Sequence, residues 1–398
     1  MKACFITFGC RLSRAEALDE EATYQAKGWE LTDQHAEADL FVVRGCSVTS
    51  RAQRECEKLI DHLRRKYPFT QLKICGCLDQ AKKTSPLLHA RGITPATLAA
   101  GNNAAAPVPT RTARAYLKVQ DGCSGKCTFC IVPRFRGASR SVPFEEVLDK
   151  ARRFVDAGYH EIVVTGCNLS LYASGGKRLP ELLAALAQIS PNCRIRLGSI
   201  EPGACANETV DILAAHANIC KFLHIPIQSG SNATLSAMRR PYLVKDIEAL
   251  VTKAVSLMPH IGLGCDVMTG FPGETDMDFL ATRGLLERMP FSNAHVFPYS
   301  ERPDTPAAAS LNIVPKPVRS ERAHELADLI RTKRHRFAKT FIGQEVEIVV
   351  EDEKKQAGWT SEYLWFEKVT TAGQTPTPRK GLLRAKVFTA TSHRLQGR

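Results

Sequence analysis

Three cysteines lie in one short stretch of the chain at a spacing that suits a metal cluster. Cys123, Cys127 and Cys130 form a CxxxCxxC pattern with glycines beside it and Phe129 directly before the last thiol. Three thiolates this close together can hold three irons of a [4Fe–4S] cluster, and no fourth cysteine follows at ferredoxin-like spacing. A zinc loop or three unrelated thiols are the alternatives, but zinc takes four ligands and is usually held by CxxC pairs. The pattern therefore favours a cluster with one open iron.

An iron with an open position can bind the amino and carboxylate groups of S-adenosylmethionine (SAM). One electron from the cluster then cleaves the sulfonium and releases a 5′-deoxyadenosyl radical, so the loop predicts radical chemistry. Three arginines follow it: Arg134, Arg136 and Arg140. Their charges could neutralise a cluster, the SAM carboxylate or an RNA phosphate, or they could be surface residues with no such role.

A second set of thiols lies near the start of the chain. Cys10, Cys46 and Cys77 each follow a short apolar run that predicts a strand, and these runs are Cys4–Phe8, Asp39–Val43 and Leu72–Cys75. The carboxyl ends of strands form the ligand crevice of open α/β sheets. The three thiols could therefore form a second cluster site, with Cys75 as a competing ligand, or they could be buried core residues. Spacing alone does not choose between these readings.

The elements around these thiols predict a parallel α/β domain over residues 1–101. Helical patterns at Arg14–Lys27 and Ala52–Lys66 alternate with the three strands, which favours a parallel sheet with helices on both faces. Residues 102–113 are rich in Ala, Pro, Asn and Thr and predict a linker.

A longer β/α alternation follows over residues 114–339. The predicted strands are Ala115–Gln120, Glu161–Thr165, Arg194–Gly198, Phe222–Pro226, Gly262–Val267 and Ala294–Phe297. The helices between them are Phe144–Ala157, Leu179–Ile189, Glu208–Ala217, Lys245–Met258 and Asp276–Met289. Six strands with five helices predict an open, partial (β/α)6 barrel, with a doubly wound sheet as the alternative. The CxxxCxxC loop follows the first strand, at the face where barrel chemistry occurs.

Polar residues and glycines follow the barrel strands where a ligand would lie. They predict a SAM pocket made by Gly166, Asn168, Ser199, Glu201, Gln228 and Asp266. Glycine lets the backbone approach a ligand closely, and carboxylate or amide side chains can bind ribose or amino groups. Each of these residues could instead form a turn or cap a helix.

The last part of the chain changes character. A basic helical stretch, Val318–Lys339, precedes a small all-β module over residues 340–398 with strands at Val346–Val350, Tyr363–Val369 and Leu382–Phe388. Aromatic and basic residues in it suit RNA binding, although the aromatics could equally be the core of a small barrel. These residues are Trp359, Tyr363, Trp365, Arg379, Lys380, Arg384 and Lys386.

Overall composition indicates a globular protein with a polyanionic partner. The 398 residues carry a net charge of +13, which favours nucleic acid over other partners, although a generic basic surface is the alternative. The N-terminus has no signal-peptide pattern, and no apolar run approaches the roughly 20 residues of a membrane helix. We therefore expect a cytoplasmic protein with reduced thiols and no membrane contact.

Taken with these motifs, the chain resembles the radical-SAM methylthiotransferases over nearly its whole length. The segments 122–137, His224-Ile-Pro-Ile-Gln-Ser-Gly-Ser and Gly270-Phe-Pro-Gly-Glu-Thr carry the resemblance. It implies a second [4Fe–4S] cluster on Cys10, Cys46 and Cys77, and a C-terminal TRAM-like RNA-binding module. Two positions depart from the usual pattern: Ser13 replaces an asparagine, and Arg44-Gly45 replaces Asn-Thr before the second cysteine.

Within that family, the segment that begins at His295 most resembles the branch that acts on N6-threonylcarbamoyladenosine beside the anticodon of tRNA. We therefore predict an enzyme that adds a methylthio group at C2 of this adenosine, with two [4Fe–4S] clusters, SAM, a reductant and a sulfur donor, and with RNA rather than DNA as its partner. The alternatives are isopentenyladenosine in tRNA, an aspartate of a ribosomal protein, or a non-catalytic RNA-binding protein that holds zinc.

Overall fold

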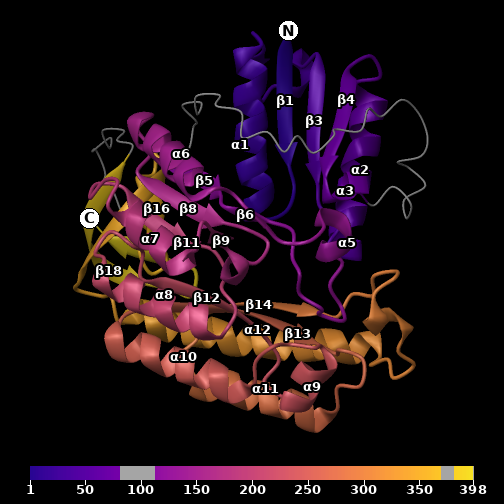
Figure 1. Ribbon diagram of the computed structural model, residues 1–398, viewed down its shortest axis with the longest axis vertical. Coiled ribbons are helices and arrows are strands. Elements are labelled where there is room, and N and C mark those ends of the chain that lie inside the picture. The colour runs from indigo at the N-terminus through magenta and orange to yellow at the C-terminus, as the bar shows by residue number, and fades with distance from the viewer. Residues whose placement is uncertain (81–112, 369–380, 398) are drawn as a thin grey trace.

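The computed structural model describes residues 1–80, 113–368 and 381–397. In Figure 1 a small sheet with its helices stands above a larger barrel, and a second, all-β barrel lies at the side of the larger one. The predicted linker, apart from Ala113, lies outside the described residues, as do Arg379 and Lys380.

The N-terminal sheet has the predicted parallel α/β construction. Its order is β2-β1-β3-β4. The strands are β1 (Lys2–Thr7), β2 (Glu30–Leu31), β3 (Leu40–Gly45) and β4 (Gln71–Gly76), and the helices are α1 (Arg11–Ala26), α2 (Ser50–Lys66) and the short α3 (Cys77–Gln80). Every residue of the central strand β3 is buried, as expected for a strand covered on both faces. The two-residue strand β2 was not predicted because it is too short to show a period.

The middle of the chain forms the predicted open barrel. One parallel sheet contains β5 (Arg114–Lys118), β8 (Glu161–Thr165) and β11 (Arg194–Leu197); the other contains β12 (Phe222–Gln228), β13 (Gly262–Thr269) and β14 (Asn293–Pro298). Isolated parallel bridges, such as Ser199 to His224, join the two sheets. Six parallel strands thus follow one another in chain order, and no pairing in the described residues closes β14 onto β5.

Helices cover the outside of this barrel (Figure 1). They are α6 (Phe144–Asp156), α7 (Leu179–Ala187), α8 (Ala204–Ala215), α10 (Val244–Leu257), α11 (Asp276–Arg288) and α12 (Lys316–Lys339). The shorter elements are α5 (Val132–Arg136), α9 (Asn232–Ala237), β6 (Gln120–Asp121), β7 (Arg140–Ser141), β9 (Ala173–Ser174) and β10 (Lys177–Arg178). Helix α8 begins four residues before its predicted start.

The inner face of the barrel is partly covered by the N-terminal domain. Leu117 and Val164 point to the outer helices and belong to the main core. Tyr116 and Val163 alternate with them and pack on Ala15 of α1 instead. Helix α1 therefore lies over the inner face of β5 and β8. On β14, at the far side of the barrel, His295 has an exposed side chain.

The C-terminal module is a closed barrel, as predicted, with strand order β15-β16-β17-β19-β18. Its strands are β15 (Glu345–Asp352), β16 (Ala357–Thr360), β17 (Trp365–Lys368), β18 (Leu382–Ala390) and β19 (Arg394–Gly397). Strands β16 and β19 were not predicted. The stretch expected to begin a strand at Tyr363 begins it at Trp365, because Tyr363 lies in a turn with φ of 66°.

Two aromatic residues of this module, Trp359 and Tyr363, lie outside the core of the small barrel. The buried core of the small barrel contains Ile348, Phe366 and Val387, but neither Trp359 nor Tyr363. Tyr363 stacks on Trp359 and packs 4.7 Å from the ring of Phe222, at the start of β12. Of the two readings that the sequence left open, a core position is therefore wrong for this pair, which lies at the contact between the two barrels.

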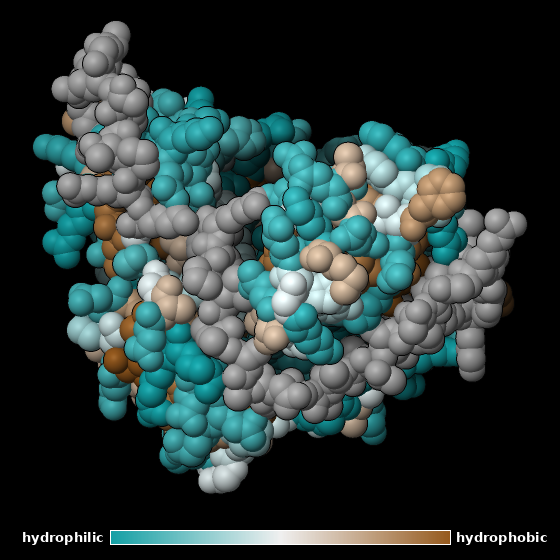
Figure 2. All heavy atoms as spheres, turned by 90° about the horizontal axis from the view of Figure 1, so that it is seen from above, coloured by the Kyte–Doolittle hydropathy of each residue, from teal (hydrophilic) through white to brown (hydrophobic). Residues whose placement is uncertain are grey.

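Buried charges join the same two barrels. Arg194 and Arg196 on β11 both bind the carboxylate of Glu161 on β8, and Arg196 also donates 2.7 Å to the carbonyl oxygen of Thr360. From above, the described surface is mostly hydrophilic, and its apolar side chains lie singly or in small groups (Figure 2). None of the helices in the described ranges is long and apolar enough to span a membrane.

Candidate iron–sulfur and SAM site

The CxxxCxxC loop follows β5 and β6 and ends at α5, at the carboxyl end of the barrel strands. Gly125 lies between two of its thiols: its amide is 3.3 Å from the sulfur of Cys123. A Cβ atom at Gly125 would lie 3.2 Å from the sulfur of Cys123 and 3.9 Å from that of Cys127. The glycine thus leaves free the space between the sulfurs, which is where a cluster bound by all three thiols would need room.

The surroundings of these thiols suit a bound cation. Burial raises the pKa of Cys130 to about 11, and the neighbouring Cys127 and Cys123 act in the same direction. Burial also raises the pKa of Cys127, opposed by Arg240, whose Nη1 donates 3.0 Å to the sulfur. Metals bind the thiolate form of cysteine, and burial disfavours that charged form. A bound cation would therefore stabilise the thiolates at this site.

Arg240 connects the loop to the predicted SAM residues. Its Nη2 donates to Glu201 Oε1, and Asn168 Nδ2 donates 2.9 Å to the other oxygen of the same carboxylate. The backbone amide of Asn168 donates 2.9 Å to Gln120 Oε1. A Cβ atom at Gly166 would lie 2.9 Å from that same oxygen, so a larger residue would not fit without a shift.

Gln228 is the second candidate for direct contact with a ligand. Its backbone has φ of 63°, a conformation that is costly for a residue with a side chain. Its Oε1 atom is buried and has no hydrogen-bond partner. An orphaned acceptor of this kind fits a ligand that brings a donor, such as an amino group. Ser199 lies on the neighbouring strand and forms the bridge to His224.

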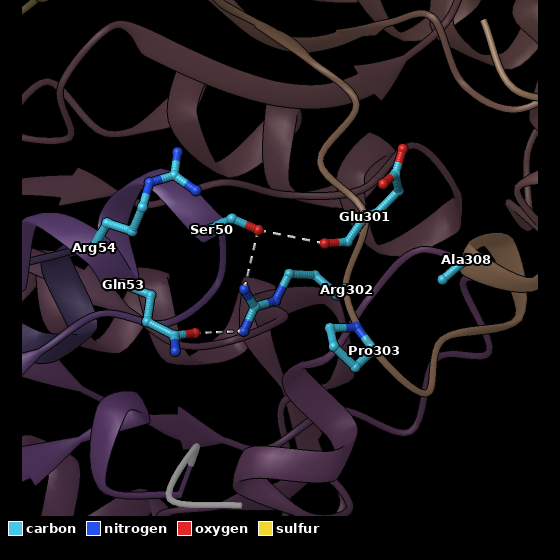
Figure 3. Close-up of a pocket in the computed structure, with 7 residues that line it drawn as sticks. All are labelled: Ser50, Gln53, Arg54, Glu301, Arg302, Pro303 and Ala308. Carbon is cyan, nitrogen blue, oxygen red and sulfur yellow. Dashed lines mark hydrogen bonds between the residues drawn. The ribbon is translucent and has the colours of Figure 1, made fainter. Parts of the chain in front are cut away.

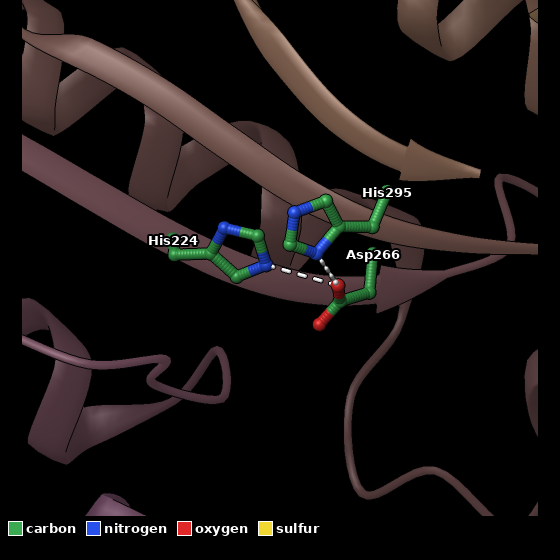
Figure 4. Close-up of side chains that lie close together, drawn as sticks. All are labelled: His224, Asp266 and His295. Atoms are coloured by element: carbon green, nitrogen blue, oxygen red, sulfur yellow. Dashed lines mark ion pairs between the residues drawn. The ribbon is translucent and has the colours of Figure 1, made fainter. Parts of the chain in front are cut away.

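Asp266 is placed differently from the other predicted SAM residues. It lies in the middle of β13 and pairs with histidines on both neighbouring strands (Figure 4). The distances from its Oδ1 are 3.1 Å to His224 Nε2 and 3.2 Å to His295 Nδ1. Gly264 makes room for His224, because a Cβ atom there would lie 2.8 Å from Nδ1 of the imidazole. The two imidazoles and the carboxylate have the right donor atoms for a divalent cation. Without a cation, the two imidazoles can each donate a hydrogen bond to the carboxylate, so the cluster does not require a metal.

The second set of thiols lies at the carboxyl ends of three neighbouring strands of the N-terminal sheet. Cys10 caps α1, Cys46 follows β3, and Cys77 begins α3 after β4. Burial raises the pKa of Cys46, and Cys77 and Cys10 act in the same direction. Gly9 has φ of 110°, and a Cβ atom there would lie 3.2 Å from Cys46 Cβ.

Cys75 does not share this site. Its sulfur lies 3.7 Å from the carbonyl oxygen of Val43, and the residue packs with Leu40 and Val42. Burial raises its pKa to about 12. Cys77 instead packs against Ile131 and Phe135 of the barrel domain. The positive φ of Gly76 turns the chain between them, so the expectation from extended spacing that Cys75 competes for the site is wrong.

The unusual residues near these thiols have structural partners. Arg44 is buried and pairs with Glu16 at 2.8 Å and Glu20 at 2.6 Å. A Cβ atom at Gly45 would lie 2.6 Å from the side chain of Leu78, so Leu78 occupies the space that a threonine would need. Ser13 has a buried Oγ without a hydrogen-bond partner, so its hydroxyl could bond a group held at the adjacent thiols.

Of the three arginines after the loop, Arg136 joins the two thiol sites. It binds Glu16 of α1 at 2.8 Å and Asp121, beside the loop, at 3.1 Å. Burial raises the pKa of the Cys77 thiol, and the positive charge of Arg136 acts against this. Arg134 forms an exposed pair with Asp304, and Arg140 donates to backbone carbonyls. Sequence reasoning missed Gln120, Arg240 and Glu16, because none lies in a spaced motif.

These features define a class of protein, and comparisons with known proteins agree. Residues 117–286 match the family described as the Radical SAM superfamily, and residues 2–94 match one described as Uncharacterized protein family UPF0004. A radical SAM methyltransferase, TsrM from Kitasatospora setae, has the same fold with a TM-score of 0.55 and 14% identity over 77% of each chain. The protein is thus a radical SAM enzyme with an α/β fold.

Two relatives of similar length show which group of radical SAM enzymes the chain belongs to. The chain is 31% identical to the threonylcarbamoyladenosine tRNA methylthiotransferase MtaB of Bacillus subtilis, over 90% of this chain and 88% of that protein. It is 32% identical to the tRNA-2-methylthio-N(6)-dimethylallyladenosine synthase of Wolinella succinogenes, over 90% of each chain. The protein therefore belongs to the radical SAM tRNA methylthiotransferases. Enzymes of this family use SAM and two [4Fe–4S] clusters.

Proposed function

We propose that this enzyme adds a methylthio group to C2 of N6-threonylcarbamoyladenosine beside the anticodon of tRNA. The observation that carries the proposal is the placement of two thiol triads on either side of one domain boundary, joined by Arg136. The resemblance at His295 and the name of the Bacillus relative support the threonylcarbamoyl substrate. The Wolinella relative favours the second candidate, an isopentenyl-type adenosine.

In this proposal the two triads have separate tasks. Cys123, Cys127 and Cys130 hold one cluster, and Cys10, Cys46 and Cys77 hold the other. When bound, the clusters supply the electron that cleaves SAM and the sulfur that is transferred, with a reductant and a sulfur donor as partners. The aromatic C2–H bond is too strong and too weakly acidic for acid/base chemistry, which is why the reaction needs a radical.

Four polar side chains of the chain orient SAM. Glu201 and Asn168 are fixed to each other, and Arg240 fixes Glu201 to the loop, so these side chains offer a preorganised surface beside the open iron position. Gln228 offers its unsatisfied oxygen to the SAM amino group. Helix α1 excludes water from the inner face of β5 and β8.

The substrate base approaches the part of the inner face that α1 leaves open. His295 is exposed there, and Asp266 holds its ring in place. The small barrel, residues 340–398, docks the RNA with exposed residues such as Arg384 and Lys386. The anticodon loop suits such a site because its bases are already partly unstacked.

Nucleoside mass spectrometry of tRNA from strains with and without the gene tests the proposal. We expect the deletion to lose the 2-methylthio form of threonylcarbamoyladenosine, to accumulate the unmodified nucleoside, and to be restored by the intact gene. Loss of a methylthiolated isopentenyladenosine would instead favour the second candidate. An unchanged tRNA with an altered ribosomal protein would refute both.

A further inference from the structure

A cavity of about 470 Å³ lies where the N-terminal domain meets the barrel (Figure 3). One wall is the start of α2, and the other is the segment after β14. Its lining residues are Ser50, Gln53, Arg54, Glu301, Arg302, Pro303 and Ala308. Helix α2 begins just after Cys46, so this cavity lies beside the second thiol triad.

Arg302 is the unusual residue of this cavity. It is 5% exposed, yet all of its hydrogen-bond partners are neutral. Its Nη2 donates 3.1 Å to Ser47 Oγ and 2.9 Å to Gln53 Oε1, and its Nη1 lies 3.4 Å from Ser50 Oγ. Its Nε is buried without a partner. Glu301 lines the same cavity but pairs with Arg319.

Other buried arginines provide an internal comparison. In the described part of the chain, each of the following pairs directly with a carboxylate: Arg44, Arg136, Arg194, Arg196, Arg240, Arg319 and Arg322. No such ion pair is found for Arg302 among the described residues. A buried charge without a counter-charge is strongly unfavourable, so the site points to a missing anion.

Arg302 approaches the second triad at Cys46, which carries a negative charge only as a thiolate. Burial lowers the pKa of Arg302, and the charge of Cys46, followed by that of Glu57, acts against this. Ser47, which accepts from Arg302, is the residue directly after Cys46. Glu57 lies behind Gln53, whose Nε2 donates 3.0 Å to it.

We propose that Arg302 is the counter-charge of the second thiol site, supplied by the barrel domain across the domain boundary. This inference rests on the proposed cluster at Cys10, Cys46 and Cys77. Three thiolates outweigh the positive charge of an oxidised cubane core by about one unit, so a loaded site is anionic. Arg136 also acts on this site by opposing the rise in the pKa of Cys77 that burial causes, but Glu16 and Asp121 already neutralise Arg136. Arg302 is therefore a positioning residue whose charge is balanced only when the site is loaded.

The test compares Arg302→Met and Arg302→Lys with Arg54→Met, which removes an exposed arginine from the same cavity. All are made in the full chain with Cys123, Cys127 and Cys130 changed to serine, so that the second cluster alone remains. The measurements are iron content, the midpoint potential of that cluster, and the Tm of the protein with and without it.

Arg302→Met should shift the potential to more negative values, because removing a nearby positive charge favours the oxidised cluster. It should also reduce the gain in Tm on cluster loading by roughly 2–4 °C. Arg302→Lys should restore most of both effects, and Arg54→Met should change neither. If Arg302→Met does not fold, the potentials of Arg302→Lys and Arg302→Gln decide, since only the latter removes the charge.

An unchanged potential and loading gain in Arg302→Met would overturn the inference. If Arg302→Met left the potential unchanged but weakened tRNA binding, the inference would also be wrong, because Arg302 would then bind an RNA phosphate. These failures differ from that of the proposed function. If changing Cys10, Cys46 and Cys77 to serine leaves the iron content of the otherwise intact chain unaltered, the second cluster site itself is wrong.

Discussion

The two thiol triads are built in opposite ways. Cys123, Cys127 and Cys130 belong to one loop, and Gly125 inside that loop keeps two sulfurs accessible. The other triad needs three strands of a sheet to deliver one thiol each. Its surroundings also include Arg136 and Arg302 from a different domain. We infer that the loop is a local site that tolerates changes elsewhere, whereas the second triad depends on the whole N-terminal domain and on its docking.

The largest expected effect separates the two sites by function. Cys127→Ser should reduce SAM cleavage by reconstituted protein to background, since the loop would lose a cluster ligand. Cys46→Ser should preserve SAM cleavage and abolish methylthiolation of tRNA. High-performance liquid chromatography of 5′-deoxyadenosine and mass spectrometry of the tRNA measure the two outcomes. The division of roles fails if Cys46→Ser still thiolates, and Cys193→Ser, a buried thiol in neither triad, is the control.

The loop is also the site that could be read most directly from the sequence. Its cysteine spacing, glycines and Phe129 are local, and so are the strand patterns that place it at the barrel face. The second triad was left open by spacing, because only the folded sheet brings its residues together. Gln120, Arg240 and Arg302 could not be predicted, since each acts through contacts with residues distant in sequence. The strand expected to begin at Tyr363 begins at Trp365, because Tyr363 lies in a turn that packs on a second domain.

Glu16 tests whether the domain boundary supports the second triad. Glu16→Gln leaves Arg136 and Arg44 without a shared carboxylate, and breaking a buried pair of this kind costs about 3–5 kcal/mol of unfolding free energy. Urea denaturation of cluster-free protein measures this cost. We expect the iron content of the second site to fall more than that of the loop. The exposed Glu55, paired with Arg51, provides the control Glu55→Gln, which should leave stability unchanged.

The same residue predicts a dependence on pH. Burial alone would raise the pKa of Glu16, but Arg136, Lys118 and Arg44 lower it to about 2. Because its folded pKa lies below its unfolded value of about 4.3, its contribution is complete above that pH and is lost as pH falls toward 2. Linkage gives roughly 3 kcal/mol over this range. Wild-type stability should therefore fall more steeply than that of Glu16→Gln between these pH values; parallel curves would contradict the assignment.

A smaller effect should distinguish Gly9, which lies beside a thiol, from Gly28, which does not. Gly9→Ala meets both a positive φ and Cys46, whereas Gly28→Ala meets a positive φ with nothing within 4 Å. The left-handed conformation costs about 1–2 kcal/mol in either variant, and only Gly9→Ala should cost more than this. Gly125→Ala has no such backbone strain, so it should preserve stability and reduce iron incorporation at the loop alone. Equal stabilities of Gly9→Ala and Gly28→Ala would show that the second triad tolerates crowding.

The smallest effect is expected at Arg134, and Arg136 on the same short helix provides the contrast. Arg134 and Arg136 are two residues apart on α5, but the side chain of Arg134 is 50% exposed and that of Arg136 is 5% exposed. The Arg134–Asp304 pair is screened by water and salt, so Arg134→Ala should cost less than about 1 kcal/mol, and high salt should erase the difference. Arg136→Ala should lose stability that salt does not restore, because its partners are buried. If salt changed the stabilities of both variants by the same amount, the Arg136–Glu16 pair between the two domains would behave as a surface ion pair. The second triad would then not depend on the docking of the N-terminal domain on the barrel.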